Sequence, residues 1–169
     1  MFEIILLLVF LVIVCQIVYT SIKIGISPMP SSFKACQIMN ELSRRSKETT
    51  IVDVGSGFGF LGLFFALKNP TKKIIGYEVS LFPWVISLVL KCIFRCDNLF
   101  FYKRNFLKIN FPKNCLIICY LFPEGMKTLE KKLETRNLKI ISNTFTFKIQ
   151  KHKKIVRVND LYQTPIYVY

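Results

Sequence analysis

The sequence has little negative charge and almost no histidine. Its 169 residues include 24 lysines and arginines against 10 aspartates and glutamates, so the formal net charge is +14. Such a surface attracts phosphate-rich partners, either anionic lipid headgroups or nucleic acid, although a basic proteome background produces the same balance. The single histidine, His152, lies in a basic run at residues 148–154 and is interpreted as a surface residue. The chain therefore offers no histidine base near the motifs described below.

The six cysteines do not follow a pattern that predicts a metal centre. Cys92 and Cys96 are four residues apart in an expected helix, and Cys115 and Cys119 are four apart in an expected strand. Four strand residues span about 13 Å, which is too far for two ligands of one zinc ion with bonds of about 2.3 Å. We therefore expect no metal, and free thiols in a reducing compartment.

A long uncharged run at the amino terminus indicates a membrane anchor. No residue between Glu3 and Lys23 carries a charge. At about 1.5 Å per residue, this run can cross a hydrocarbon core of about 30 Å. It lacks the basic start and the small-residue cleavage site of a secretory signal peptide. We therefore predict one uncleaved, single-pass transmembrane helix within residues 1–26, with the lipid bilayer as its partner.

The residues that follow predict an orientation and a linker. Basic side chains lie on the carboxyl side of the run, whereas the amino side has only the terminus and Glu3; the basic residues are Lys23, Lys34, Arg44, Arg45 and Lys47. By the positive-inside tendency, the rest of the chain faces the cytoplasm. Pro28 and Pro30 break the helix. Residues 27–48 are predicted to form a linker and a short amphipathic helix capped by Ser31 or Ser32, and residues 49–169 a domain.

The stretch 50–66, TIVDVGSGFGFLGLFFA, reads as a buried strand, a glycine turn and the start of a helix. Buried parallel strands are short and continuously apolar, so Asp53 near the end of this strand is conspicuous. Glycines at alternate positions, Gly55, Gly57 and Gly59, let the backbone turn tightly. They also let a ligand lie against bare N–H groups at a helix N-terminus. The alternative is an ordinary turn that uses glycines for packing.

A second expected strand, residues 73–77, ends in Glu78. An acid at this position, about 20 residues after the glycine turn, accepts hydrogen bonds from the two hydroxyls of a ribose that lies across the strand ends. Asp53, just before the turn, would repel a pyrophosphate and instead suits a ligand with positive charge. The pair therefore favours a nucleoside without a pyrophosphate; the alternative for Glu78 is a solvated loop residue.

The remaining apolar runs complete an α/β fold. We expect strands at 98–102, 115–120 and 138–142, an antiparallel terminal pair at 155–158 and 166–169, and helices at 33–42, 81–94 and 126–134. Phe82 and Trp84 either flank an adenine or pack on the sheet. The charged face of the helix at 126–134, which includes Glu130, is expected to be solvated.

Several of these segments carry motifs of a known family. DVGSGFG resembles the first motif of the class I S-adenosylmethionine-dependent methyltransferases, whose cofactor bears an ammonium and a sulfonium. The order SPMPSS, VDVGSGFG, GYEVS, PWVIS, YLFPEGMKTLEKKL, ISNTF and TPIYVY is similar to that of small, membrane-anchored methyltransferases, which include the mitochondrial lysine methyltransferases that act on the ATP synthase c-ring protein. This resemblance implies a Rossmann-like sheet, mostly parallel with an antiparallel carboxyl-terminal strand, and S-adenosylmethionine as cofactor.

The resemblance also implies roles for individual residues. Those expected to bind the cofactor are Asp53, Gly55, Ser56, Gly57 and Gly59 at its methionine end, Glu78 at its ribose and Asn105 near its adenine. Those expected on the acceptor side are Tyr120, which orients the acceptor amine, and Phe122 and Pro123, which form a wall. The chain departs from the family pattern at Phe58 and Asn105, where relatives often have acidic residues.

The function that the resemblance implies is methylation of a protein lysine, on a substrate such as an integral membrane protein within reach of the anchor. RNA and lipid are alternative acceptors, although no basic strand with interleaved aromatic residues of the RNA-binding type is evident. A third possibility is a non-catalytic, membrane-anchored binding or assembly module that keeps the fold, which the departures at Phe58 and Asn105 favour.

Overall fold

The computed structural model describes residues 31–136 and 138–169 and, nearer the amino terminus, residues 3–5, 7–8, 10–11, 14–15 and 18. Much of the predicted transmembrane segment, and residues 27–30 of the predicted linker, lie outside these residues. The described residues between 3 and 18 are helical and expose apolar side chains such as Ile4, Phe10 and Val18. Within the described part of the chain, no helix has both the length and the apolar character needed to cross a bilayer.

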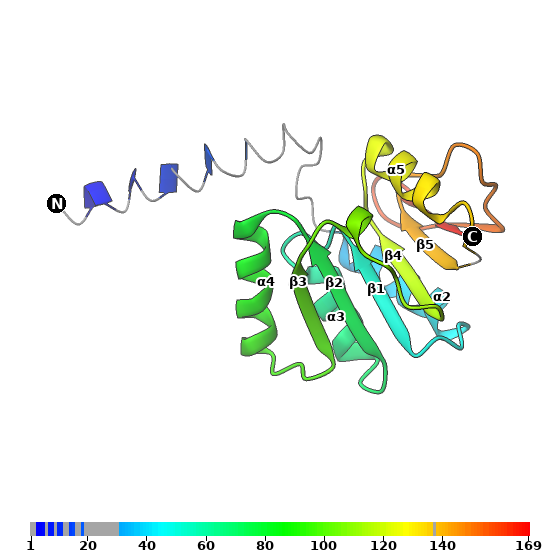
Figure 1. The fold of residues 1–169 in the computed structure, drawn as a ribbon, viewed down its shortest axis with the longest axis horizontal. Helices are drawn as coiled ribbons and strands as arrows, with labels where there is room; N and C mark the ends of the chain where they lie inside the picture. Colours follow the sequence, from blue (N-terminus) through cyan, green and yellow to red (C-terminus); the bar gives the residue numbers. More distant parts are fainter. Residues whose placement is uncertain are drawn as a thin grey trace.

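The described residues build a seven-stranded sheet with the order β3-β2-β1-β4-β5-β7-β6 (Figure 1). The strands are β1 (Thr50–Val54), β2 (Lys73–Glu78), β3 (Leu99–Lys103), β4 (Cys115–Cys119), β5 (Lys139–Asn143), β6 (Lys154–Arg157) and β7 (Pro165–Val168). Strands β1 to β5 run parallel, and β7 pairs antiparallel with both β5 and β6. The predicted mixed sheet, mostly parallel with an antiparallel carboxyl-terminal strand, is confirmed.

Helices pack on both faces of the sheet. Helices α2 (Phe33–Arg44), α3 (Phe60–Lys68) and α4 (Leu81–Ile93) share a core with one face, and α5 (Pro123–Leu133) and the 3₁₀ turn η1 (Phe106–Lys108) share a core with the other. Side chains alternate along a strand. Ile51 of β1 therefore packs with the first group of helices, and Val52 and Val54 pack with the second.

The two helices that flank the candidate site begin at local signals in the sequence. Ser32 caps α2, as predicted, by accepting a hydrogen bond from the backbone N–H of Ala35 at 3.2 Å. Helix α5 begins at Pro123, three residues earlier than predicted, because proline fits the first turn of a helix and Glu124 places an acid near the positive end of the helix dipole. The predicted wall residue Pro123 is thus the first residue of α5, where it is exposed.

The strand order reverses between β1 and β4, because β2 and β3 follow on one side and β5 on the other. In open α/β sheets, ligands bind outside the carboxyl ends of the strands at such a switch point. The glycine turn leaves β1 at this edge, and Tyr120 leaves β4 there. Ser31 reaches the same edge, since its hydroxyl accepts a hydrogen bond from the amide of Asn143, the last residue of β5, at 3.0 Å.

Candidate functional site

The turn between β1 and α3 is built on three glycines in a left-handed conformation. Gly55, Gly57 and Gly59 have φ of 73°, 53° and 82°, values that residues with a Cβ rarely adopt. The backbone N–H groups of Gly55 and Ser56 both donate to the carbonyl of Tyr77 at 3.0 Å. The turn is therefore fixed to the end of β2, the strand that carries Glu78.

Two of these glycines are required by packing, and the third faces open space. A Cβ at Gly55 would lie 2.6 Å from Cδ2 of Leu121, and a Cβ at Gly59 would lie 2.6 Å from the ring of Phe101. A Cβ at Gly57 would meet nothing within 4 Å. The backbone of Gly57 is therefore the part of the turn that a ligand can approach closely.

The carboxylate of Glu78 connects the end of β2 to this open part of the turn. Its Oε2 accepts a hydrogen bond from the N–H of Gly57 at 2.9 Å. Its Oε1 accepts from the N–H groups of Val79 at 2.9 Å and Ser80 at 2.7 Å. A carboxylate offers about four lone-pair sites, so Oε2 retains the capacity to accept hydrogen bonds from a ligand. The three backbone donors hold the carboxylate in place for that purpose, and the solvated-loop alternative for Glu78 is wrong.

Asp53 is buried beside this carboxylate with an unsatisfied oxygen. The residue is 2 % exposed. Burial, and secondarily the negative charge of Glu78, raise the pKa of its carboxyl to about 7, against a smaller lowering by a hydrogen bond from the backbone of Gly62. Among the described residues, the buried side-chain atoms without a hydrogen-bond partner are Asp53 Oδ2 and Ser56 Oγ. Such atoms are uncommon in folded proteins, and both adjoin the glycine turn.

An aromatic cluster stands at the carboxyl ends of β4 and β5. The ring of Tyr120 stacks on Phe145 with centroids 6.3 Å apart and an interplanar angle of 19°. Phe122 also contacts Phe145, at 5.4 Å. Sequence reasoning assigned no role to Phe145, although it ends the ISNTF motif just after β5. The position of that motif, at the end of a strand that neighbours β4, was the signal that could have identified it.

One curated relative shares part of the sequence. The chain is 31% identical over 106 residues to a Xenopus laevis enzyme, the lysine N-methyltransferase of the ATP synthase c-ring protein, a match that covers 59% of this chain and 44% of the relative. The chain thus spans less than half the length of the curated relative it matches. No protein-family model matches the sequence.

Solved structures share the fold. An RNA methyltransferase from Salinibacter ruber, in complex with S-adenosyl-L-homocysteine, matches with a TM-score of 0.72 at 18% identity, over 83% of this chain and 92% of that one. A tRNA (uracil-54, C5)-methyltransferase from Pyrococcus abyssi, with the same ligand, has a TM-score of 0.66 at 15% identity, over 82% and 38% of the two chains. The chain has the class I S-adenosylmethionine-dependent methyltransferase fold.

Within this methyltransferase fold, the structure brings together most of the residues singled out from the sequence. The glycine turn, Asp53 and Glu78 meet at the ends of β1 and β2, and Tyr120 and Phe122 follow β4, the strand on the other side of β1. Asn105 follows β3, where its Oδ1 accepts a hydrogen bond from the N–H of Leu107 at 2.9 Å and caps η1. Its amide is therefore partly committed to local structure.

The aromatic residues of α4 divide between the two roles considered for them. Trp84 packs against the core, and its indole N–H donates to the carbonyl of Phe101 at 3.3 Å, so the packing interpretation holds for it. Phe82 lies next to the turn, because its ring contacts that of Phe58 at 6.3 Å with an edge-to-face angle of 89°.

Glu130 of α5 corrects the prediction of a solvated outer face. It is 8 % exposed, and its carboxylate accepts hydrogen bonds from the backbone N–H groups of Lys148, Ile149 and Gln150 at 2.7–3.1 Å. Glu130 thus holds the basic loop that precedes β6. In burial and in the number of backbone donors it is a close counterpart of Glu78, although it belongs to the opposite face of the sheet.

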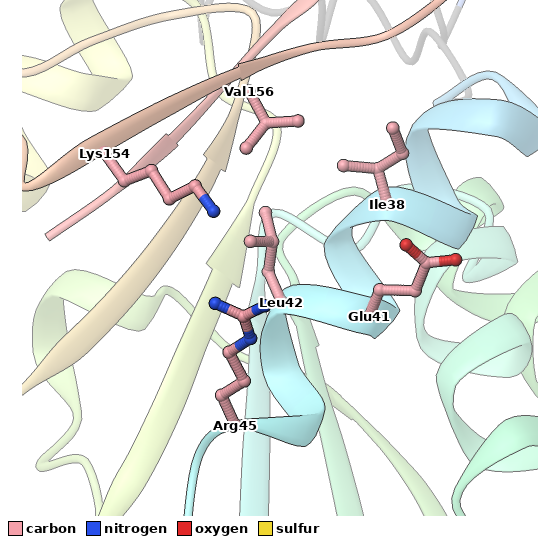
Figure 2. Close-up of a pocket in the computed structure, with 6 residues that line it drawn as sticks. All are labelled: Ile38, Glu41, Leu42, Arg45, Lys154 and Val156. Atoms are coloured by element: carbon pink, nitrogen blue, oxygen red, sulfur yellow. The ribbon is translucent and has the colours of Figure 1, made fainter.

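A small pocket lies far from these residues, at the other edge of the sheet (Figure 2). It has a volume of about 160 Å³ and is lined by Ile38, Glu41, Leu42, Arg45, Lys154 and Val156. Arg45 precedes β1, and Lys154 begins β6, which runs in the same direction as β5. The pocket therefore belongs to the amino ends of the strands and is separate from the glycine turn.

Proposed function

We propose that this chain is a membrane-anchored methyltransferase that uses S-adenosylmethionine to methylate a protein lysine. The observation that carries the proposal is the Glu78 carboxylate, fixed by backbone donors beside the open backbone of Gly57 at the switch point of the sheet. An ordinary packing turn does not need an oriented acceptor next to an uncovered glycine. A nucleoside ligand with a ribose diol does need one.

The residues around the turn fit S-adenosylmethionine, and the S-adenosyl-L-homocysteine in two neighbours of the same fold supports this assignment. Glu78 accepts hydrogen bonds from the ribose hydroxyls. At the methionine end, an ammonium group provides the partner that Asp53 Oδ2 lacks, and a carboxylate provides one for the hydroxyl of Ser56. When bound, the cofactor supplies a methyl group on a positively charged sulfur that is already a good leaving group.

The adenine end is assigned to Asn105 and the aromatic residues near the turn. An amide oxygen has two lone pairs, so Oδ1 of Asn105 can accept a hydrogen bond from an adenine amine while it caps η1. Phe58 and Phe82 offer apolar surface on the turn side. Phe58, which stands where relatives often have an acid, therefore acts through ring packing rather than charge.

On the acceptor side, the chain contributes alignment and the exclusion of water. Tyr120 orients the acceptor amine through its hydroxyl, while Phe122, Pro123 and Phe145 line the approach. A lysine has an ordinary pKa of about 10.4 and must lose its proton before it attacks. An apolar entrance on a strongly basic protein favours the neutral amine through desolvation and like-charge repulsion. The similarity to the Xenopus laevis enzyme supports lysine as the acceptor.

The membrane anchor is proposed for residues 1–26. The uncharged run is supported by its described residues, which are helical and leave Ile4, Leu7 and Phe10 more than half exposed. Aliphatic side chains arranged in this way need an apolar environment. Under this proposal the methyltransferase domain faces the cytoplasm. Resistance of the full chain to alkaline extraction from membranes tests the anchor, and release into the soluble fraction contradicts it.

The catalytic proposal is tested by methyl transfer. The full chain and its Glu78→Gln variant are incubated with labelled S-adenosylmethionine and with membranes from cells that lack this protein, and methylated residues are identified by mass spectrometry. We expect one or a few lysine-bearing peptides to gain methyl groups with the wild-type chain only. The Glu130→Gln variant is the matched control and should retain activity. If no acceptor is methylated and no cofactor binds, the non-catalytic module is favoured instead.

A second candidate acceptor is RNA, and one observation favours it. On the sheet face that carries α5, the rings of Tyr77 and Tyr102 stack at 5.8 Å, and Phe100 lies beneath the ammonium groups of Lys73 and Lys91 at 5.1 and 4.8 Å. Aromatic side chains with neighbouring cations bind unstacked bases. In the experiment above, label that is sensitive to ribonuclease and resistant to protease identifies this function.

A further inference from the structure

Helix α4 exposes a continuous apolar stripe. Its exposed members recur every four residues, which places them on one side of the helix: Leu81 is 43 % exposed, Val85 40 %, Val89 48 % and Ile93 65 %. The opposite side of the helix packs on the sheet through buried Pro83 and Ser87 and half-buried Trp84 and Leu88. These four residues, Leu81, Val85, Val89 and Ile93, are called the α4 apolar face below.

The α4 apolar face stands at one end of the sheet, next to β3 (Figure 1). Phe94, the residue after the helix, is also 49 % exposed and extends the face. A contiguous apolar surface of this kind, with no described element covering it, marks an interaction site rather than a solvated helix. What covers it is indicated by the charges around it.

The charged side chains near the α4 apolar face have one sign. Between residues 60 and 96 the cations are Lys68, Lys72, Lys73, Lys91 and Arg95, and the carboxylate is that of Glu78. Glu78 is buried against three backbone donors, so it does not oppose them at the surface. Asp97 is the first exposed acid after the helix. An apolar stripe bordered by cations is the composition of helices that lie in the interface of an anionic bilayer.

We propose that the α4 apolar face lies on the surface of an anionic lipid bilayer, with its aliphatic side chains at the boundary between headgroups and acyl chains and with Lys91 and Arg95 at the level of the phosphates. This contact is separate from the anchor proposed for residues 1–26. It goes beyond the proposed function, because it requires neither methyl transfer nor cofactor binding. It also has a consequence for that function.

The bilayer contact places the cofactor site close to the membrane surface. Helix α4 begins three residues after Glu78, and the contact between Phe82 and Phe58 joins its first turn to the glycine turn. A chain held by α4 therefore presents the carboxyl ends of its strands next to the headgroups. An acceptor that protrudes slightly from the bilayer can reach the site from that position.

The exposed thiol of Cys92 allows a direct test, because it lies on α4 near the α4 apolar face. The full chain with Cys15→Ser is labelled at Cys92 with an environment-sensitive fluorophore and reconstituted into phosphatidylcholine vesicles with and without phosphatidylserine. We expect quenching by nitroxide-labelled lipid and protection from iodide when phosphatidylserine is present. We expect Val89→Glu with Ile93→Glu to abolish the lipid quenching. Both side chains are exposed, so these changes leave the core intact.

A label on the other face of the sheet is the control. Lys127 on α5 is exposed, so a Lys127→Cys chain that lacks Cys15 and Cys92 should be quenched by iodide and not by lipid. A label at Cys15 in a Cys92→Ser chain reports on the anchor alone, so that failure of the anchor and failure of the α4 contact are distinguished. Iodide access at Cys92 in anionic vesicles overturns the proposal. Protection from both quenchers also overturns it, because it indicates a protein partner or a second copy on α4.

Discussion

The carboxylate of Glu78 accepts a hydrogen bond from the backbone N–H of Gly57, which lies 21 residues earlier in the chain, at 2.9 Å. This bond joins the end of β2 to the one glycine of the turn whose surroundings are open. It fixes an acceptor beside exposed backbone, and the proposed cofactor site is built outward from it.

Substitutions at Gly57 and Gly59 should affect different properties. At Gly57 an alanine methyl meets open space, so we expect only the strain of a positive φ, about 1–2 kcal/mol of stability, together with a loss of S-adenosyl-L-homocysteine binding of about tenfold or more. At Gly59 the added methyl collides with Phe101 and with Ser87 at 2.7 Å, so we expect a larger loss of stability. Chemical denaturation and calorimetric titration measure the two effects. Equal stability losses in the two variants would contradict the assignment of Gly57 to the ligand.

The buried carboxyl of Asp53 predicts a distinctive dependence of stability on pH. Its pKa is about 7 in the folded chain and 3.8 as an ordinary value, so the folded state binds a proton that the unfolded state has released. The contribution of Asp53 to the free energy of unfolding is therefore fully present below about pH 4 and is lost as the pH rises through about 7. Asp53→Asn should remove this contribution.

The measurement is denaturant unfolding of the ligand-free wild-type chain and the Asp53→Asn variant between pH 4 and 8, with the difference between the two taken at each pH. Other titrating groups are common to both chains and cancel. We expect the variant to gain stability relative to the wild type as the pH rises. A difference that is constant with pH would mean that Asp53 is ionised throughout this range.

Tyr120→Phe should separate acceptor orientation from cofactor binding. The ring keeps its contact with Phe145, so the change removes only the hydroxyl. We expect kcat/KM for methyl transfer to fall about tenfold, the usual scale for one well-placed hydrogen bond, with S-adenosyl-L-homocysteine affinity unchanged. Steady-state kinetics on the acceptor found by mass spectrometry provide the test. Unaltered transfer would remove Tyr120 from the proposed mechanism.

Much of the frame was predictable because the signals are local. The strand from Thr50 to Val54, the glycines that follow it and Glu78 at the end of β2 are all visible as short patterns, and the folded chain places them together. The terminal antiparallel pair was also predictable, since two short apolar runs flank a polar connection. Such features depend on a few neighbouring residues and on the alternation of side chains along strands.

Contacts between distant segments were not predictable from the same patterns. Phe145 meets Tyr120 only because β5 pairs with β4, and Glu130 looked like part of a solvated helix face until the backbone of residues 148–150 folded onto it. Phe101 gives another reason for two glycines, because its ring occupies the space beside Gly59 and Gly76. These roles are set by tertiary packing and leave no periodic trace in the sequence.

The proposed cofactor site is tested most directly by titration of S-adenosyl-L-homocysteine into the wild-type chain and its Glu78→Gln and Glu130→Gln variants. The two glutamates are 9 % and 8 % exposed, and each accepts three backbone N–H bonds, so the two changes perturb folding to a similar degree. The account predicts binding that Glu130→Gln preserves and Glu78→Gln weakens at least tenfold, since the loss of a charged acceptor for two hydroxyls costs about 1.5–3 kcal/mol. Equal affinity in all three chains, or no binding by the folded wild type, would contradict it.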